Sequence, residues 1–480
     1  MIFFRWLIVL LLFVIVPFYA LSQSAVEKKY ISRVSQQRLQ QNVRDLVKIG
    51  HRMGGTKSGD NSSRYIYNAF RTYGYKPDLI KDQEKLTFSA ERWSLQIEQP
   101  KRLRGLIQHE WLANYSPSVK RDTAQLVFIK SIKDADKTLI DSGIVLLENP
   151  PTEELYEALV EAGTRCIVCY VASHSNAYSN WAMIYSLKER KDNPIPVFTI
   201  SNIAGKRIRA ELDKDTRIVM RFFARTKIKL AKPKTVIATL NGSTDEYYLV
   251  CAHGDSDSGG PGADDNASGV SGLLEIARNL KHLVDNKTLP IPRCSIRFVV
   301  WGSETFSTKN YIKKNEKELN KIRGVINIDE IGSGKTRSCI YFEGNDIPQN
   351  QDLLRVFEKI GEEYVDKYGF WKEATTNPAQ GGTDSYIFLP QSLDRLDVPE
   401  IKIPSITVFT TAWNEPKAMQ QTHGWISKAW KGHPDSVNID YSPYYHSSLD
   451  IPAFTTDKEP SRMVWAVNAV GISLIRLIWN

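Results

Sequence analysis

The second half of the chain alternates short apolar segments with amphipathic ones. Apolar segments of strand length, most of them rich in β-branched residues, lie at 236–240, 247–252, 295–301, 324–329 and 403–409, and helical patterns intervene. Strands that alternate with helices are typical of a mostly parallel sheet covered on both faces. We therefore expect an α/β fold built on a mostly parallel, twisted sheet flanked by helices.

Residues 96–232 have a different, smaller α/β pattern. Segments of strand character at 143–148, 165–171 and 195–201 surround a helical segment that ends at Gly163. The stretch has no cluster of His, Asp or Glu of catalytic type. We expect it to be an inserted domain without chemistry of its own. The larger domain would then comprise residues 25–95 and 233–480.

The N-terminus has the pattern of a secretory signal peptide over residues 1–24. One arginine precedes a short apolar run, and Ser22 and Ser24 are small residues suited to cleavage. The run is shorter than the roughly 20 residues of a spanning helix, so an uncleaved membrane anchor is the less favoured alternative. We find no later segment apolar enough to span a membrane. These features predict a secreted or periplasmic protein without stable membrane insertion.

Charge and cysteine content argue against two classes of protein. The formal net charge is +9, but the basic residues are scattered rather than gathered in a block, so we expect no nucleic-acid binding. The five cysteines are odd in number, and Cys166 and Cys169 have no second pair with which to form a zinc ribbon. We expect all five to be buried small residues rather than a disulfide framework.

Histidine and acidic side chains follow several of the predicted strands. An isolated acid after a strand is usually a helix cap or a solvated turn. In an open α/β sheet, however, sites form at the carboxyl ends of the strands, and imidazole and carboxylate are zinc ligands. Several such residues at the strand ends of one sheet therefore predict a metal site. Its candidate residues are His253, Asp255, Asp264, Asp265, Glu304, Asp329 and His446.

In these residues the chain resembles the co-catalytic zinc aminopeptidases and their glutamate carboxypeptidase relatives. The resemblance rests on six segments in the family's order, at 252–256, 262–269, 301–304, 327–329, 381–384 and 446–450. It covers roughly residues 30–85 and 235–480, and it implies a fold of the zinc exopeptidase type. The inserted segment resembles the protease-associated domain that many members carry.

The resemblance implies a metal ligand set. His253 and Asp329 would bind one zinc ion of a pair, and His446 would bind the other. Asp264 would bridge the two ions.

The resemblance also implies three supporting roles. Asp255 would orient His253, as outer carboxylates commonly do for metal-bound histidines. Asp265 would support the bridging carboxylate through its backbone. Glu304 would be the general base that takes a proton from the metal-activated water.

The chain departs from the family pattern at position 305. The family has two adjacent glutamates here, the first a base and the second a metal ligand, whereas this chain has Glu304 followed by Thr305. A neutral hydroxyl is a poor substitute for a carboxylate, so we expect one tight zinc ion and a second that is weak or absent. If the loop before Tyr311 shifts the register, Glu304 would instead be the ligand and no base would remain.

Aromatic residues near the predicted site are candidates for lining a substrate pocket, although packing is their commoner role. They are Trp371, His423, Trp425 and Tyr444.

Together, the sequence predicts an exported zinc-dependent exopeptidase acting on peptides. We find no arginine pair to bind a terminal carboxylate, which favours an aminopeptidase over a carboxypeptidase. Two alternatives stay open because of Thr305. One is a catalytically inactive receptor or scaffold with the same fold, and the other is a single-zinc enzyme that cyclises N-terminal glutamine.

Overall fold

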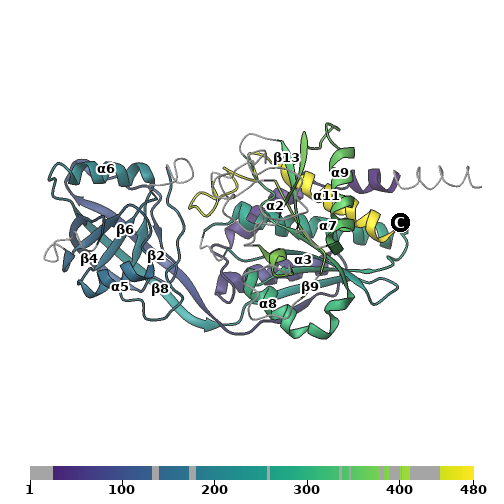
Figure 1. The fold of residues 1–480 in the computed structure, drawn as a ribbon, viewed down its shortest axis with the longest axis horizontal. Helices are drawn as coiled ribbons and strands as arrows, with labels where there is room; N and C mark the ends of the chain where they lie inside the picture. The colour runs from purple at the N-terminus through teal and green to yellow at the C-terminus, as the bar shows by residue number, and fades with distance from the viewer. Residues whose placement is uncertain are drawn as a thin grey trace, which may run out of the picture.

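The structure is a computed structural model that contains two sheets (Figure 1). The predicted signal peptide, His423 and Trp425 lie outside the residues that it describes. Those residues are 25–131, 140–171, 180–256, 260–334, 338–344, 348–378, 383–388, 401, 403–410 and 444–479.

The larger sheet has eight strands in the order β1-β9-β11-β10-β12-β15-β13-β14. Four central strands are parallel to one another, namely β11 (Ser295–Trp301), β10 (Tyr247–His253), β12 (Ile322–Ile328) and β15 (Ser405–Phe409). On one side the sheet continues with β9 (Lys234–Leu240) and β1 (Asp78–Lys81), and on the other with β13 (Cys339–Gly344) and β14 (Glu373–Pro378). The mostly parallel arrangement of the prediction is confirmed.

Both faces of this sheet are covered, because its strands are apolar on both sides. Val250 and Ala252 of β10 belong to one hydrophobic core, whereas Leu249 and Cys251 belong to another on the opposite face. The first core is closed by α2 (Gln36–Lys48), α3 (Lys57–Thr72), α7 (Gly269–Asp285), α9 (Gln351–Glu363) and α11 (Ser461–Ile478). The second includes residues of α8 (Glu304–Lys314) and η4 (Glu316–Lys321). Burial on both faces accounts for apolar runs without alternation.

Helix α11 corrects one expectation from the sequence. It is long and apolar enough to cross a membrane, with a mean hydropathy of 1.3 over 18 residues, whereas no such segment was expected after the N-terminus. In the structure 78% of that stretch is buried, and the helix packs against α7 and α9. Its apolar composition is that of a helix buried in a protein core.

The smaller sheet has seven strands in the order β2-β8-β4-β5-β6-β7-β3. The long strands β2 (Lys85–Gln99) and β8 (Val219–Ala231) pair antiparallel and run from the larger lobe into the smaller one (Figure 1). The domain boundary expected at residue 96 therefore falls within β2. The rest of the sheet is formed by β4 (Val119–Phe128), β5 (Ile144–Leu147), β6 (Cys166–Cys169), β7 (Val197–Thr199) and β3 (Trp111–Leu112), with helices α5 (Glu153–Glu161) and α6 (Asn202–Leu212).

All five cysteines are free and buried, as expected. Cys166 and Cys169 begin and end β6 and belong to the core of the smaller lobe.

A segment of the smaller lobe contacts the loop that carries His446. The backbone N–H of Ile184 donates to the carbonyl of His446 at 2.7 Å, and Met183 forms an antiparallel bridge with Ser447. Trp181 stacks on Tyr444 with ring centroids 5.0 Å apart. Tyr444 is thus a packing residue of the contact between the lobes. Trp371, a second pocket candidate, is fully buried in the core of the larger lobe.

Candidate metal centre

His253 is the last residue of β10, and Asp255 holds its ring. The Nδ1 atom of His253 lies 3.1 Å from Oδ1 of Asp255, which leaves Nε2 directed to the other acids. The same Asp255 oxygen accepts a hydrogen bond of 3.2 Å from the backbone N–H of Glu304. Asp255 therefore links the carboxyl end of β10 to the first residue of α8.

Asp265, rather than Asp264, lies between the two histidines. Its Oδ1 is 3.2 Å from Nε2 of His253, and its Oδ2 is 3.1 Å from Nε2 of His446. Asp264 instead accepts hydrogen bonds from the backbone N–H of Gly332 at 2.6 Å and from the hydroxyl of Ser333. The carboxylate of Asp265 thus faces both histidines, whereas that of Asp264 faces Gly332 and Ser333.

Two residues that the sequence analysis left without a role support this turn. The carboxylate of Asp450 accepts the backbone N–H groups of Asp264 at 2.8 Å and of Asp265 at 3.1 Å. The buried guanidinium of Arg52 donates to the carbonyls of Pro261 and Gly262, both at 2.7 Å. Asp450 ends one of the family segments, which was a usable signal. Nothing in the local sequence marks Arg52.

Asp329 completes a group with the geometry of a metal site. It follows β12, and its Oδ2 accepts a hydrogen bond from Thr383 at 2.8 Å. Its Oδ1 is buried without a hydrogen-bond partner among the described residues and lies 3.5 Å from Nε2 of His253. Ligand atoms of His253, Asp265 and Asp329 all lie within 4.8 Å of one another. One imidazole and two carboxylates, with an orphaned oxygen among them, fit Zn²⁺ bound with an open position.

A cavity of about 90 Å³ adjoins this group. Glu304 lines the cavity from the start of α8, whereas Thr305 is not among the described residues that do so. A second ion held by Asp265 and His446 would therefore lack a carboxylate at position 305. The cavity wall comprises His253, Asp265, Glu304, Asp329, Glu330, Glu343, Thr383, Thr407, Phe409, Tyr445 and His446.

Two carboxylates of that wall, Glu330 and Glu343, were not among the predicted site residues. Glu330 directly follows Asp329, and Glu343 lies near the end of β13. The position after a strand-end aspartate was a signal that could have identified Glu330. The sequence around Glu343 gave no comparable signal, because β13 did not appear among the predicted strands.

The crowded charges control one another's pKa values. Burial raises the pKa of Glu304 well above its usual range, with a contribution from Asp384 and against the opposing effect of His253. Burial alone would lower the pKa of His253, but Glu304 and Asp329 raise it well above its usual range. Burial alone would raise the pKa of Asp265, but hydrogen bonds with both histidines outweigh burial and lower that pKa. Such an excess of buried negative charge suits a divalent cation.

A further acid of the family segments, Asp384, is fully buried at the start of η6 (Asp384–Phe388). Neither of its carboxylate oxygens has a hydrogen-bond partner among the described residues. Burial raises its pKa well above the usual range, so this side chain favours its uncharged form.

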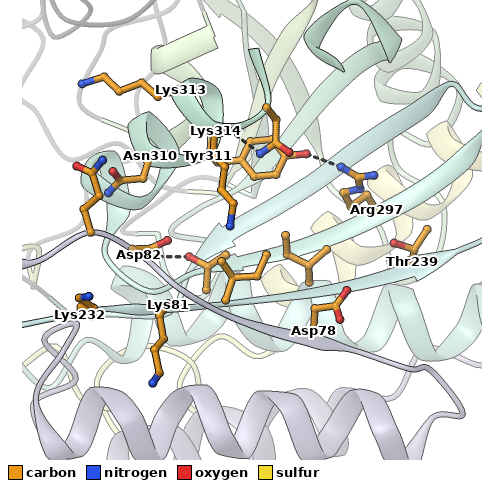
Figure 2. Close-up of a pocket in the computed structure, with 15 residues that line it drawn as sticks. Asp78, Lys81, Asp82, Lys232, Thr239, Arg297, Asn310, Tyr311, Lys313 and Lys314 are labelled. Carbon is orange, nitrogen blue, oxygen red and sulfur yellow. Dashed lines mark hydrogen bonds between the residues drawn. The ribbon is translucent and has the colours of Figure 1, made fainter. Parts of the chain in front are cut away.

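Figure 2 shows a separate cleft of about 650 Å³ between the β1–β9 edge and α8. It contains none of the residues that form the metal group. In its wall Asp82 accepts hydrogen bonds from Thr235 at 2.9 Å and from Ser307 at 2.6 Å. Ser307 belongs to α8, so Asp82 connects this cleft to the helix that begins with Glu304.

Residues 235–470 match the family model of peptidase family M28. Leucine aminopeptidase 2 from Trichophyton rubrum is 24% identical over 309 residues, which cover 61% of this chain and 57% of that protein. A probable lipoprotein aminopeptidase, LpqL, from Mycobacterium tuberculosis is 25% identical over 359 residues, which cover 72% of this chain and 63% of that protein. The chain thus spans less than two thirds of the length of either relative.

Solved structures show the same fold. A peptidase M28 precursor from Shewanella amazonensis superimposes with a TM-score of 0.64 at 18% identity, covering 95% of this chain and 96% of that one. A zinc aminopeptidase from Bacillus subtilis superimposes with a TM-score of 0.60 at 20% identity, covering 93% and 96%. The α/β fold with helices on both faces of the sheet is therefore that of zinc aminopeptidase structures.

Proposed function

Because residues 235–470 belong to peptidase family M28, we propose that this protein is a zinc-dependent aminopeptidase that releases the first residue of peptides. The observation that carries the proposal is the group of His253, Asp265 and Asp329, with Glu304 lining the same cavity. Relatives that are named aminopeptidases support it.

In this proposal His253, Asp265 and Asp329 hold a tight zinc ion. Asp265 presents its second oxygen to a weaker site with His446, which is 3.1 Å away. Thr305 leaves that second site one carboxylate short. When bound, zinc would polarise the scissile carbonyl and increase the acidity of the attacking water.

Glu304 acts as the general base. Its carboxylate takes a proton from the attacking water and passes it to the nitrogen of the leaving peptide. Burial raises the pKa of Glu304, which makes its carboxylate a stronger base than an exposed glutamate. Asp255 fixes His253 and the backbone of Glu304 together, so it sets the distance between ligand and base.

The charge of the cavity favours the amino end of a peptide over the carboxyl end. Carboxylates of Glu304, Asp329, Glu330 and Glu343 line it, and no Lys or Arg does so among the described residues. A terminal ammonium is attracted by such a surface, whereas a terminal carboxylate is repelled.

We further propose that the protein is exported by residues 1–24 and that the smaller lobe is a protease-associated-like domain. The contact of Ile184 with His446 supports a role of this lobe in shaping access to the site. Oligomeric state has no part in the proposal.

The test is hydrolysis of aminoacyl p-nitroanilides by purified protein, with its zinc content measured in parallel. We expect hydrolysis that a chelator abolishes and zinc restores. Glu304→Gln should lower kcat by at least about 10²-fold while the tight zinc remains. Bound zinc without turnover on any aminoacyl substrate would instead favour cyclisation of N-terminal glutamine or an inactive scaffold.

A further inference from the structure

The cavity beside the metal group has more carboxylates than the proposed chemistry uses. His253, Asp265 and Asp329 serve as metal ligands and Glu304 as the general base, whereas Glu330 and Glu343 only add to the negative charge that attracts the terminal ammonium. A buried carboxylate is costly unless a cation or hydrogen-bond donors compensate it. Glu330 in particular requires an explanation, because one of its carboxylate oxygens is buried without a hydrogen-bond partner among the described residues.

Glu330 is buried and lacks a full set of partners. Glu330 is only 5% exposed, and its Oε1 has no hydrogen-bond partner among the described residues. Its backbone is left-handed, with φ of 44°, and is held by Thr410, whose N–H donates to the Glu330 carbonyl at 3.2 Å. The backbone is therefore fixed while one carboxylate oxygen remains available to a ligand.

Glu343 lines the same cavity from β13, the strand that pairs with β15. Strand register places Glu343 opposite Thr407 and Tyr341 opposite Phe409. Alternation along β15 puts Thr407 and Phe409 on one face, and both line the cavity. Phe409 is stacked on Tyr341 with ring centroids 5.1 Å apart, so it forms a rigid apolar wall next to the acid.

The cavity thus combines apolar rings with buried acids. Phe409 and Tyr445 supply the rings, and Glu330 and Glu343 supply the acids. A side chain that fits both has a long alkyl stem and a cationic end, because such chains bury their methylenes and pair their charge.

On the basis of the proposed aminopeptidase function, we propose that Glu330 and Glu343 form an acidic specificity pocket that selects peptides whose first residue is lysine or arginine. The alkyl stem packs against Phe409 and Tyr445, and the charged end pairs with the two glutamates.

The alternative task for Glu330 is to replace the carboxylate that Thr305 lacks. The group of ligand atoms within 4.8 Å of one another contains neither Glu330 nor His446, so it assigns Glu330 to neither role. The two roles differ in an observable way, since only a ligand would change zinc binding.

The experiment compares kcat/KM for lysyl, arginyl and norleucyl p-nitroanilides, because norleucine has a similar alkyl chain without the charge. We expect the wild-type protein to prefer the cationic substrates by roughly 10- to 100-fold, the range of a charged hydrogen bond. Glu330→Gln and Glu343→Gln should each lower the ratio of lysyl to norleucyl kcat/KM at least about fivefold with unchanged zinc content, because any weaker attraction of the terminal ammonium affects both substrates equally. Glu362→Gln on the exposed face of α9 is the matched control.

The outcomes separate the two proposals. No hydrolysis of any of the three substrates would overturn the aminopeptidase function itself. Hydrolysis of norleucyl p-nitroanilide as fast as the lysyl compound would overturn only the acidic pocket, and this result needs no variant to fold. Loss of zinc from Glu330→Gln would overturn the pocket by making Glu330 a ligand.

Discussion

Adjacent aspartates perform different tasks at this site because the backbone between them turns. Asp265 lies between His253 and His446, while Asp264 accepts hydrogen bonds from Gly332 and Ser333. Both carboxylates are buried, so the difference between their pKa values comes from their different partners. Burial raises the pKa of Asp264 to about 6, whereas the histidines lower that of Asp265.

The first prediction distinguishes these two residues. Asp265→Asn should weaken zinc binding at least about 10²-fold, because the amide lacks the negative charge that the carboxylate offers to the metal sites at His253 and His446. Asp264→Asn should retain zinc, since an amide can still accept from Gly332 and donate to the hydroxyl of Ser333. Isothermal titration with zinc measures both. Equal losses in the two variants would contradict the assignment.

The second prediction concerns position 305. Thr305→Glu should raise the bound zinc from about one equivalent toward two, because it adds a carboxylate where His446 and Asp265 supply only two ligands. Metal analysis after dialysis against trace zinc gives the stoichiometry, and Thr305→Gln is the uncharged control. A wild-type protein that already holds two ions of equal affinity would show that the second site needs no such carboxylate.

Among the elements, the turn between β11 and α8 is stabilised by a half-buried acid, Asp82. Asp82 accepts from Thr235 and Ser307, and these two hydroxyls in turn accept the backbone N–H groups of Gly302 at 3.2 Å and Ser303 at 2.8 Å. The start of α8, and with it Glu304, therefore depends on a network in the cleft of Figure 2.

The third prediction is a pH dependence from this network. Burial raises the pKa of Asp82 from 3.8 to about 6, against the hydrogen bonds of Ser307 and Thr235. Between about pH 4 and 6 the folded state binds the proton more tightly, so the free energy of unfolding falls as pH rises through that window. Asp82→Asn should therefore be more stable than wild type by about 1–2 kcal/mol at pH 7.5, less than the full shift because Asp82 is partly exposed.

Urea unfolding at pH 7.5 and pH 4 tests the Asp82 prediction, because the advantage of the variant should vanish at the lower pH. Asp78→Asn, in the same cleft, serves as the control. A variant less stable than wild type at both pH values would mean that the charge itself is needed.

At the scale of the whole molecule, the two lobes meet at the loop that carries a candidate ligand. In the smaller lobe, the backbone N–H of Ile184 donates a hydrogen bond to the carbonyl of His446, and the ring of Trp181 stacks on that of Tyr444. The larger lobe fixes His253, Asp265 and Asp329 by its own strands and turns. Among the described residues, the loop of His446 is therefore held by both lobes.

The fourth prediction follows from this contact. Trp181→Ala should lower kcat/KM about 2- to 10-fold, corresponding to the loss of one aromatic pair, by loosening the His446 loop. Zinc at the His253 site should be unaffected. Ile203→Ala, which removes an exposed side chain from α6 of the same lobe, is the control and should leave kcat/KM unchanged. Equal effects of the two substitutions would show that the lobe contact does not influence the site.

Short stretches of the sequence were enough to predict the sheet and a metal site at its strand ends. Apolar strands without alternation, such as residues 247–252, indicate burial on both faces, and His253, Glu304 and Asp329 stand at strand ends where such sheets place ligands. These signals are local, because burial and strand ends are visible in a few consecutive residues. Comparison of this short segment with the family's two adjacent glutamates also identified the missing carboxylate at Thr305.

Which side chains meet, by contrast, depends on contacts between segments that are far apart in the chain. Asp450 orients a turn 185 residues earlier in the chain, and this contact decides that Asp265 rather than Asp264 faces the histidines. Glu343 reaches the cavity through its pairing with β15, and His446 contacts the smaller lobe. Side-chain direction at a turn and pairing between distant strands depend on packing across the whole chain, so no local pattern contains them.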